Sequence, residues 1–224
     1  MCGRFALATE KHLLEMLYQL ELRDDLLPAY NITPSQNIIA CRISPEHGKR
    51  ELVTLKWGLV PFWAEDESIG SRMINARLET AAEKPSYRDA FKKRRLLIPV
   101  SGFYEWKSED GVKQPFYIKR KDGQLFSLAG LWERWNKRSE PFESCSILTT
   151  EPNDLIAKLH NRMPLIISQE FYERWLDPAV EGSALQELLT PYPADELTFY
   201  PVSRLVNSPA NNSPELLKPL ENID

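Results

Sequence analysis

The second residue of the chain is a cysteine that could offer two nucleophiles. Met1 is normally excised when a small residue follows it, and its removal would leave Cys2 with a free α-amine beside its thiol. Reference pKa values of about 7.7–8.0 for an α-amine and about 8.5 for a thiol keep part of each reactive at neutral pH. Such an aminothiol condenses with an aldehyde, first as an imine and then, by sulfur attack, as a thiazolidine ring. The alternative is a small packed cysteine at the start of a strand.

Two other side chains have the chemistry to transfer protons. His160 follows a predicted helix at Asn153 to Leu159, where it could act as a base or be a hydrogen-bonded structural residue. Glu105 lies among aromatic residues, in Phe103-Tyr104-Glu105-Trp106-Lys107. A carboxylate on a buried strand needs a partner, so either an ion pair or an acid of raised pKa would account for it.

Several isolated side chains could contact nucleic acid. Three arginines stand beside aromatic or turn residues and could each meet a phosphate: Arg4, Arg77 and Arg162. Three tryptophans could stack on unpaired bases, although most tryptophans in a domain of this size belong to the core: Trp57, Trp63 and Trp106. The polar segment from Asn75 to Glu79 could cap a following helix or bind a ligand.

The bulk composition favours one ordinary globular domain over residues 1–224. The chain has 224 residues, 42% of them hydrophobic, and a net charge of −4, so any DNA contact must be a local patch. Three scattered cysteines do not form a disulfide framework or a zinc motif, and they favour a reducing compartment. No apolar segment resembles a signal peptide or a bilayer span, so a cytoplasmic location is expected. The stretch 208–224 is expected to be a loose tail.

Hydrophobic spacing predicts an α+β fold with a meandering, antiparallel sheet. Helices are predicted at Thr9 to Leu20, Tyr87 to Lys93, Asn153 to Leu159, Ser168 to Leu176 and Ser183 to Leu189. Strands are predicted at Asn37 to Ile43, Leu52 to Trp57, Leu96 to Lys107, Gln114 to Lys119, Leu125 to Leu131, Ser144 to Thr149 and Leu197 to Val202. These elements must bring Cys2, Glu105 and His160 together if they are to act on one substrate.

Five separated motifs together resemble one known family. They are Met1-Cys2-Gly3-Arg4-Phe5, Trp57-Gly58-Leu59-Val60-Pro61, Asn75-Ala76-Arg77-Leu78-Glu79-Thr80, Gly102-Phe103-Tyr104-Glu105-Trp106-Lys107 and His160-Asn161-Arg162-Met163-Pro164. In order and content they resemble the SRAP family, the SOS response-associated peptidases or abasic-site-processing proteins. The resemblance implies a single compact domain on a strongly bent, mainly antiparallel, barrel-like β core with peripheral helices.

The resemblance also implies a function and a set of site residues. It implies that the protein removes its own Met1, and that Cys2 then forms a thiazolidine crosslink with an abasic site in single-stranded DNA and shields the strand from cleavage. By the same resemblance, the catalytic residues are Cys2, Asn75, Glu105 and His160. The implied DNA-binding residues are Arg4, Arg77, Trp106, Thr149 and Arg162. No metal or organic cofactor and no membrane partner are expected, and a monomer is expected.

Two other functions remain compatible with the residues. Cys2, His160 and Glu105 could form the nucleophile, base and orienting group of a peptidase that acts on other proteins. The protein could instead be a single-stranded DNA-binding module in which Cys2 is only packed. A nucleophile one residue from the start of the chain fits self-cleavage or amine chemistry better than turnover on foreign substrates.

Overall fold

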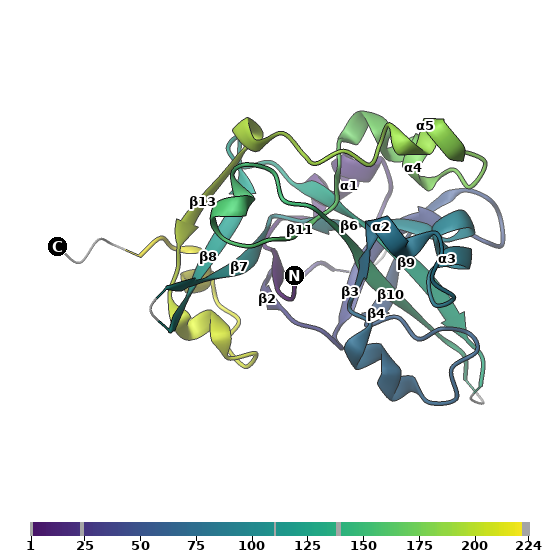
Figure 1. Cartoon of the computed structure of the whole chain (residues 1–224), viewed down its shortest axis with the longest axis horizontal. Helices are drawn as coiled ribbons and strands as arrows, with labels where there is room; N and C mark the ends of the chain where they lie inside the picture. Colours follow the sequence, from purple (N-terminus) through teal and green to yellow (C-terminus); the bar gives the residue numbers. More distant parts are fainter. Residues whose placement is uncertain (1, 23–24, 110, 138–139, 221–224) are drawn as a thin grey trace.

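A computed structural model describes residues 2–22, 25–109, 111–137 and 140–220. It confirms an α+β fold, with two mainly antiparallel sheets that pack together and short helices at the periphery (Figure 1). The five-stranded sheet, at the left of Figure 1, has the order β13-β8-β7-β1-β2. Its strands are β1 (Phe5–Leu7), β2 (Ala29–Ile32), β7 (Gly102–Glu109), β8 (Val112–Arg120) and β13 (Leu197–Pro201).

The second sheet has eight strands and includes parallel pairs that the sequence did not predict. Its main order is β11-β10-β4-β3-β6-β9-β12, and β5 pairs with β10. Strand β10 runs parallel to both β4 and β5, which corrects the expectation of a simple antiparallel meander. The strands are β3 (Asn37–Ile43), β4 (Arg50–Trp57), β5 (Asn75–Arg77), β6 (Arg95–Val100), β9 (Phe126–Trp135), β10 (Phe142–Thr150), β11 (Met163–Pro164) and β12 (Ile166–Ile167).

Short helices flank the sheets, with α2 to α5 grouped around the eight-stranded sheet in Figure 1. The α-helices are α1 (Lys11–Tyr18), α2 (Leu78–Ala81), α3 (Arg88–Lys93), α4 (Tyr172–Leu176) and α5 (Gly182–Gln186). The 3₁₀ helices are η1 (Glu67–Arg72), η2 (Ile156–Lys158), η3 (Gln169–Phe171), η4 (Ala194–Glu196), η5 (Arg204–Asn207) and η6 (Pro214–Leu217). Within the described ranges, no helix has both the length and the apolar character that a membrane crossing requires.

The predicted strand from Leu96 to Lys107 is in fact two strands in different sheets. β6 pairs with β3 and β9, whereas β7 pairs with β1 and β8. The chain crosses between the sheets at Ser101, whose backbone N–H donates to the carbonyl of Ala6 at 2.8 Å. A Cβ at Gly102 would lie 2.4 Å from the ring of Tyr117, so glycine is what allows β7 to approach β8 so closely here. This crossing delivers Glu105 to the sheet that contains the N-terminal strand.

Two other expectations are corrected by packing. Only the 3₁₀ turn η2 forms in the predicted helix from Asn153 to Leu159, because the chain must return within a few residues to pair as β11. The segment expected to be a loose tail is packed over its described part. Leu216 is buried, and the hydroxyl of Tyr200 donates to the carbonyl of Leu217 at 2.8 Å. Residues 221–224 of that segment lie outside the described residues.

Trp57 belongs to the core and is not a stacking surface. It is fully buried, its ring centroid lies 5.2 Å from that of Phe5, and its indole N–H donates to the carbonyl of Ile74 at 2.9 Å. Tryptophan is rarely buried so completely unless its N–H finds an acceptor. The packed Phe5–Trp57 pair joins the N-terminal strand to the eight-stranded sheet, which places Cys2 between the two sheets.

Candidate functional site

Cys2 lies fully buried at the junction of the two sheets. Its side chain has 0% exposure, and it packs in the same core cluster as Phe5, Trp57 and Phe103. Burial raises the pKa of the Cys2 thiol above its ordinary value, and the negative charge of Glu105 raises it further. The thiol is therefore protonated at neutral pH. A sulfur nucleophile at this position needs a base close by.

Glu105 is a buried carboxyl group whose pKa fits that need. β7 carries it next to the N-terminal segment, because Phe103 pairs with Phe5 and the N–H of Tyr104 donates to the carbonyl of Arg4 at 2.9 Å. The side chain is only 3% exposed, and burial raises the pKa of Glu105 to about 7. A carboxyl group of this pKa can accept or release a proton at neutral pH. Burial is the largest cause of this shift, and interactions with the N-terminal ammonium and with the backbone of Trp106 partly offset it. A raised pKa and a charged partner are therefore both part of the environment of Glu105.

Asn75 holds the backbone of Cys2. Its Nδ2 donates to the carbonyl oxygen of Cys2 at 2.8 Å, and its Oδ1 is buried without a hydrogen-bond partner among the described residues. The side chain is positioned by the short strand β5, where Asn75 lies opposite Ile147 of β10. The hydroxyl of Tyr87 donates to the carbonyl of Asn75 at 3.2 Å and adds a second contact that holds the strand. A buried acceptor left open beside Cys2 is suited to bind a polar substrate group.

His160 belongs to a second cluster at the end of β10. Its Nδ1 accepts a hydrogen bond from the backbone N–H of Arg162 at 3.0 Å, and burial lowers the pKa of the imidazole below its ordinary value. The guanidinium of Arg162 donates to both carboxylate oxygens of Glu79, at 2.7 and 2.9 Å. It also donates to the carbonyl of Thr149 at 2.5 Å. Thr149 is fully buried and lies opposite Arg77 in the β5–β10 pair, so this cluster adjoins the strand that carries Asn75.

Arg4 and Trp106 form a third cluster, with the C-terminal segment. Arg4 Nη1 donates to Asn31 Oδ1 at 2.7 Å and to the carbonyl of Val206 at 2.5 Å. The guanidinium carbon of Arg4 lies 5.9 Å from the centroid of the Trp106 ring, and the indole N–H of Trp106 donates to Asn207 Oδ1 at 2.8 Å. Trp106 is half-buried, so part of its ring remains accessible. The arrangement ties both residues to the 3₁₀ helix η5.

The structure thus joins eight of the nine predicted site residues into three adjacent groups. The buried centre consists of Cys2, Asn75 and Glu105. A second group, Thr149, His160 and Arg162, is connected to this centre by the pairing of β5 with β10. The third group, Arg4 and Trp106, is close in sequence to Cys2 and Glu105. Arg77 is exposed and, as the residue that precedes α2, makes no side-chain cap. The alternative that the polar segment at Asn75 to Glu79 caps the following helix therefore finds no support at the N-cap position of α2.

Supporting residues were not evident from the sequence. Asn31 donates to the carbonyls of Val206, Ser208 and Asn211 at 3.3, 3.0 and 2.7 Å while it accepts from Arg4. These partners are 175 to 180 residues away in the chain, so no local pattern could have indicated them. The sequence indicates Glu79 only as part of a polar segment. Its pairing with Arg162 spans 83 residues.

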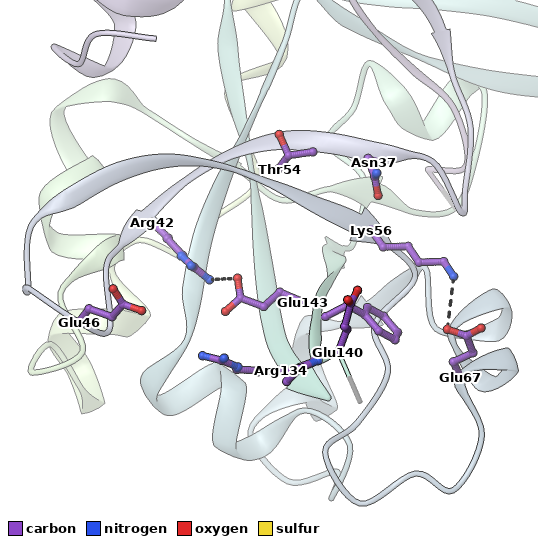
Figure 2. A pocket seen from close by; sticks show the side chains of 11 residues that line it. Asn37, Arg42, Glu46, Thr54, Lys56, Glu67, Arg134, Glu140 and Glu143 are labelled. Atoms are coloured by element: carbon purple, nitrogen blue, oxygen red, sulfur yellow. Dashed lines mark hydrogen bonds and ion pairs between the residues drawn. The ribbon is translucent and has the colours of Figure 1, made fainter. Parts of the chain in front are cut away.

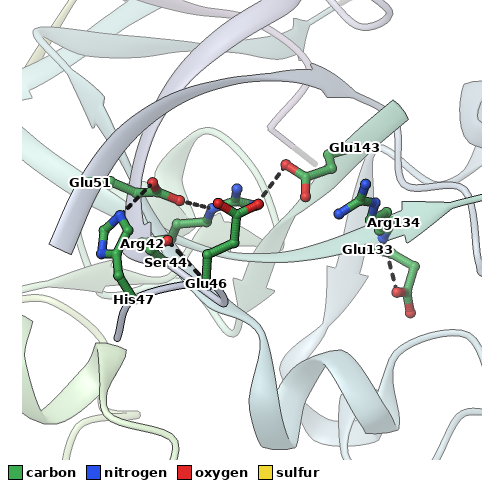
Figure 3. Close-up of polar contacts among 8 residues, drawn as sticks. All are labelled: Arg42, Ser44, Glu46, His47, Glu51, Glu133, Arg134 and Glu143. Carbon is green, nitrogen blue, oxygen red and sulfur yellow. Dashed lines mark hydrogen bonds and ion pairs between the residues drawn. The ribbon is translucent and has the colours of Figure 1, made fainter. Parts of the chain in front are cut away.

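A wide hollow elsewhere on the surface is not the candidate site. It measures about 820 Å³, lies over β3, β4, β9 and β10, and includes none of the predicted site residues. Figure 2 shows two of its three cations facing carboxylates: Arg42 contacts Glu143 at 2.7 Å and Lys56 contacts Glu67 at 3.9 Å. Arg42 also contacts Glu51 at 2.9 Å (Figure 3). Because carboxylates offset these cations, the hollow has little attraction for a phosphate backbone.

Comparison with known proteins agrees with the motifs. A family model described as SOS response associated peptidase (SRAP) matches residues 1–209. The chain is 46% identical to the abasic site processing protein YoqW of Bacillus subtilis (strain 168), over 97% of this chain and 99% of that protein. It is 30% identical to the abasic site processing protein YedK of Escherichia coli (strain K12), over 98% of this chain and 100% of that protein.

A solved structure supports the same relationship. A protein from Bacteroides thetaiotaomicron matches with a TM-score of 0.88 and 29% identity, over 97% of this chain and 99% of that one. A family model that spans most of the chain, and relatives that align over nearly all of it, lead to one conclusion: the chain belongs to the SOS response associated peptidase (SRAP) family.

Proposed function

We propose that the protein captures abasic sites in single-stranded DNA by forming a thiazolidine crosslink through Cys2 after Met1 is removed. The observation that carries the proposal is the buried centre itself. Asn75 holds the Cys2 carbonyl at 2.8 Å, and Glu105, with a pKa raised to about 7 by burial, acts electrostatically on the Cys2 thiol. The names of the YoqW and YedK relatives, which are called abasic site processing proteins, support the choice of substrate.

The first step of the proposed reaction uses the α-amine. An abasic deoxyribose opens to an aldehyde, the amine of Cys2 adds to its carbonyl carbon, and loss of water leaves an imine. This loss requires a proton on the departing oxygen and removal of one from nitrogen. Glu105 and His160 are the groups for this work: the first exchanges a proton near pH 7, and the second is held neutral by its lowered pKa. The open Oδ1 of Asn75 would accept a hydroxyl of the opened sugar.

The second step uses the thiol. Sulfur attacks the imine carbon, the thiol proton passes to Glu105, and the ring nitrogen takes up a proton, so that aldehyde and aminothiol give thiazolidine and water overall. A thiol of raised pKa attacks poorly unless a base takes its proton as the bond forms. Ring closure removes the imine before β-elimination can break the strand. This accounts for a protective role, and the same Glu105 could assist removal of Met1 by hydrolysis.

DNA contacts in this proposal come from a local surface. Exposed Arg77 and half-buried Trp106 flank the buried centre and offer a phosphate contact and a stacking surface. Arg4 and Arg162 would add to the same surface, and the buried Thr149 would position Arg162 through its carbonyl. A few such contacts are compatible with a net charge of −4.

Denaturing gel electrophoresis tests the proposal. The purified protein, confirmed by intact mass to begin at Cys2, is incubated with an oligonucleotide that carries one abasic site. A heat-stable shifted band is expected, and Cys2→Ala should abolish it. Cys41→Ala is the matched control, because Cys41 is also buried and its pKa is raised to about 12, yet it lies outside the site.

The same experiment separates the alternatives. A peptidase that acts on other proteins would cleave added peptides in a Cys2-dependent manner without crosslinking DNA. A binding module would retard the oligonucleotide only on a native gel. The proposal is refuted if protein that starts at Cys2 forms no denaturation-resistant adduct with the abasic oligonucleotide.

A further inference from the structure

Glu79 is the centre of a clamp that joins three segments of the chain. It lies in the first turn of α2, directly after strand β5. Both of its carboxylate oxygens accept hydrogen bonds from Arg162, at 2.7 and 2.9 Å, in the two-pronged geometry that fixes a guanidinium in direction as well as distance. Arg162 also donates to the carbonyl of Thr149, at the end of β10. The clamp therefore ties the start of α2 and the end of β10 to the turn that carries His160.

This ion pair differs from the usual surface pair, which contributes little. The side chain of Arg162 is only 14% exposed, whereas that of Glu79 is 45% exposed. Three of the guanidinium donors are thus directed at fixed protein acceptors, and the arginine side of the pair is largely screened from water. The hydrogen bonds from Arg162 lower the pKa of Glu79, so the carboxylate stays charged through the neutral range.

The clamp is connected to His160 through the backbone N–H of Arg162. The N–H of Arg162 lies 3.0 Å from His160 Nδ1, and an N–H can only donate, so Nδ1 is the acceptor. The carbonyl of Arg162 lies 3.2 Å from the same nitrogen. That contact would need Nδ1 to donate, whereas the N–H contact needs it to accept, and a neutral ring cannot do both at one nitrogen. The shorter contact, with its unambiguous donor, decides the assignment. The proton of neutral His160 is therefore on Nε2.

We propose that Glu79 is a positioning residue for the reaction: by holding Arg162 it keeps His160 in the tautomer that carries its proton on Nε2. Without the carboxylate, the Arg162 side chain keeps its contacts with Thr149 but loses the two-pronged contact that fixes its direction, so the N–H that selects the tautomer is held less firmly. The inference rests on the proposed function in one respect, namely that His160 exchanges protons with the substrate. Glu79 itself touches no reacting atom in this account.

The competing explanation is that Glu79 occupies the place of a DNA phosphate. In that case DNA would displace the carboxylate from Arg162, and Glu79 would weaken DNA binding. The two explanations make opposite predictions. Loss of the carboxylate should slow proton transfer without a change in affinity if Glu79 positions His160, and should tighten DNA binding without slowing the reaction if it replaces a phosphate.

The first measurement is the ¹⁵N chemical shifts of the histidine ring nitrogens by NMR near pH 7.5. The chain has three histidines, and His12 and His47 serve as internal references because they lie outside the clamp. We expect the Nε2–H signature for His160 in the parent protein and a mixture of tautomers in Glu79→Gln. Arg162→Lys, which keeps the charge but not the two-pronged contact, should give the same mixture. Glu83→Gln, on an exposed residue just beyond α2, is the control.

The second measurement is the single-turnover crosslinking rate at saturating abasic oligonucleotide, beside the Kd for the same undamaged strand. We expect Glu79→Gln to lower the crosslinking rate roughly tenfold. This is a part of the ~10²–10⁴-fold rate acceleration that a positioned proton-transfer group contributes. The Kd should stay within about twofold at fixed salt. A parent-like His160 spectrum in both variants, or a tighter Kd with an unchanged rate, would overturn the inference. The NMR measurement needs no DNA, so it tests the tautomer independently of the proposed function. Failure of the proposed function would instead appear as a parent protein that forms no crosslink.

Discussion

The side-chain amide of Asn75 donates a 2.8 Å hydrogen bond to the carbonyl oxygen of Cys2, across 73 residues of chain. This bond connects the residue that would act as nucleophile to the strand β5, which is itself anchored by Tyr87 and by its parallel pairing with β10. Core packing buries the Cys2 side chain, and this bond adds a directional constraint on its backbone. The bond makes the N-terminal nucleophile part of the rigid sheet.

Replacement of Asn75 should therefore slow crosslinking more than it changes the fold. Asn75→Ala removes the donor to the Cys2 carbonyl and the open acceptor beside it, and we expect at least a tenfold loss in rate, equivalent to about 1.4 kcal/mol. Single-turnover rates on the abasic oligonucleotide measure this. Asn37→Ala, on an exposed residue outside the site, is the control. A parent-like rate would mean that β1 alone holds Cys2 in place.

The two nucleophiles of Cys2 can be separated with Cys2→Ser. Once Met1 is removed, serine keeps the α-amine but replaces the thiol with a weaker nucleophile, so the imine should form and persist. We expect a borohydride-trapped adduct together with strand cleavage by β-elimination, where the parent leaves the strand intact. Intact mass must confirm that the variant begins at residue 2. A heat-stable adduct without reductant, on an uncut strand, would disprove thiazolidine closure as the source of stability.

The buried carboxyl of Glu105 should make the stability of the fold depend on pH. Burial raises its pKa from the ordinary 4.5 to about 7, so its contribution to stability is full below pH 4.5 and is lost as pH rises through about 7. The shift in pKa corresponds to a decrease in the free energy of unfolding on the order of 3 kcal/mol. Urea unfolding at pH 5 and pH 8 should show this drop in the parent and a smaller one in Glu105→Gln. If both proteins show the same drop, other groups dominate the pH dependence.

The arginines of the site should behave differently from one another. Arg77 is exposed, so Arg77→Ala should reduce the slope of log K against log salt for single-stranded DNA by about 0.7, the share of one phosphate contact. Arg162 is held by Glu79 and Thr149, so Arg162→Ala should also lower the free energy of unfolding, by about 1–3 kcal/mol. Binding titrations at several salt concentrations and urea unfolding measure the two effects. Arg88→Ala, exposed and outside the site, is the control.

A parent-like salt slope for Arg77→Ala would place the DNA path elsewhere. A parent-like unfolding midpoint for Arg162→Ala would mean that its contacts with Glu79 and Thr149 contribute nothing to the fold.

The tryptophans should divide into core and surface. Trp57 is fully buried and hydrogen-bonded to Ile74, so Trp57→Ala should cost about 3–5 kcal/mol of stability. Trp63 is 43% exposed, so Trp63→Ala should change stability by no more than about 0.5 kcal/mol. Urea unfolding of both variants tests the contrast. Equal destabilisation would show that the loop bearing Trp63 is part of the folding core.

Much of the fold could be predicted from the sequence because the relevant signals are local. The strand β3 was predicted with its observed bounds, and α1, β8, β9 and β10 lie where apolar periodicity and turn dipeptides placed them. The break at Ser101 could not be found in this way, because β6 and β7 read as one apolar run and differ only in their partners. The short strands β1 and β5 form only because neighbouring strands supply their hydrogen bonds.

The candidate site shows the same division. The amino-acid sequence indicates which residue types are available: a cysteine at position 2 that would become an aminothiol on removal of Met1, a carboxyl group among aromatic residues at Glu105, and an imidazole at His160. Their protonation states depend on the three-dimensional packing around them. The pKa of Glu105 is raised because burial removes its solvation, and the tautomer of His160 follows from a clamp whose anchor, Glu79, lies 83 residues from Arg162. Desolvation and long-range hydrogen bonds depend on what surrounds an atom in space, which no local stretch of sequence specifies.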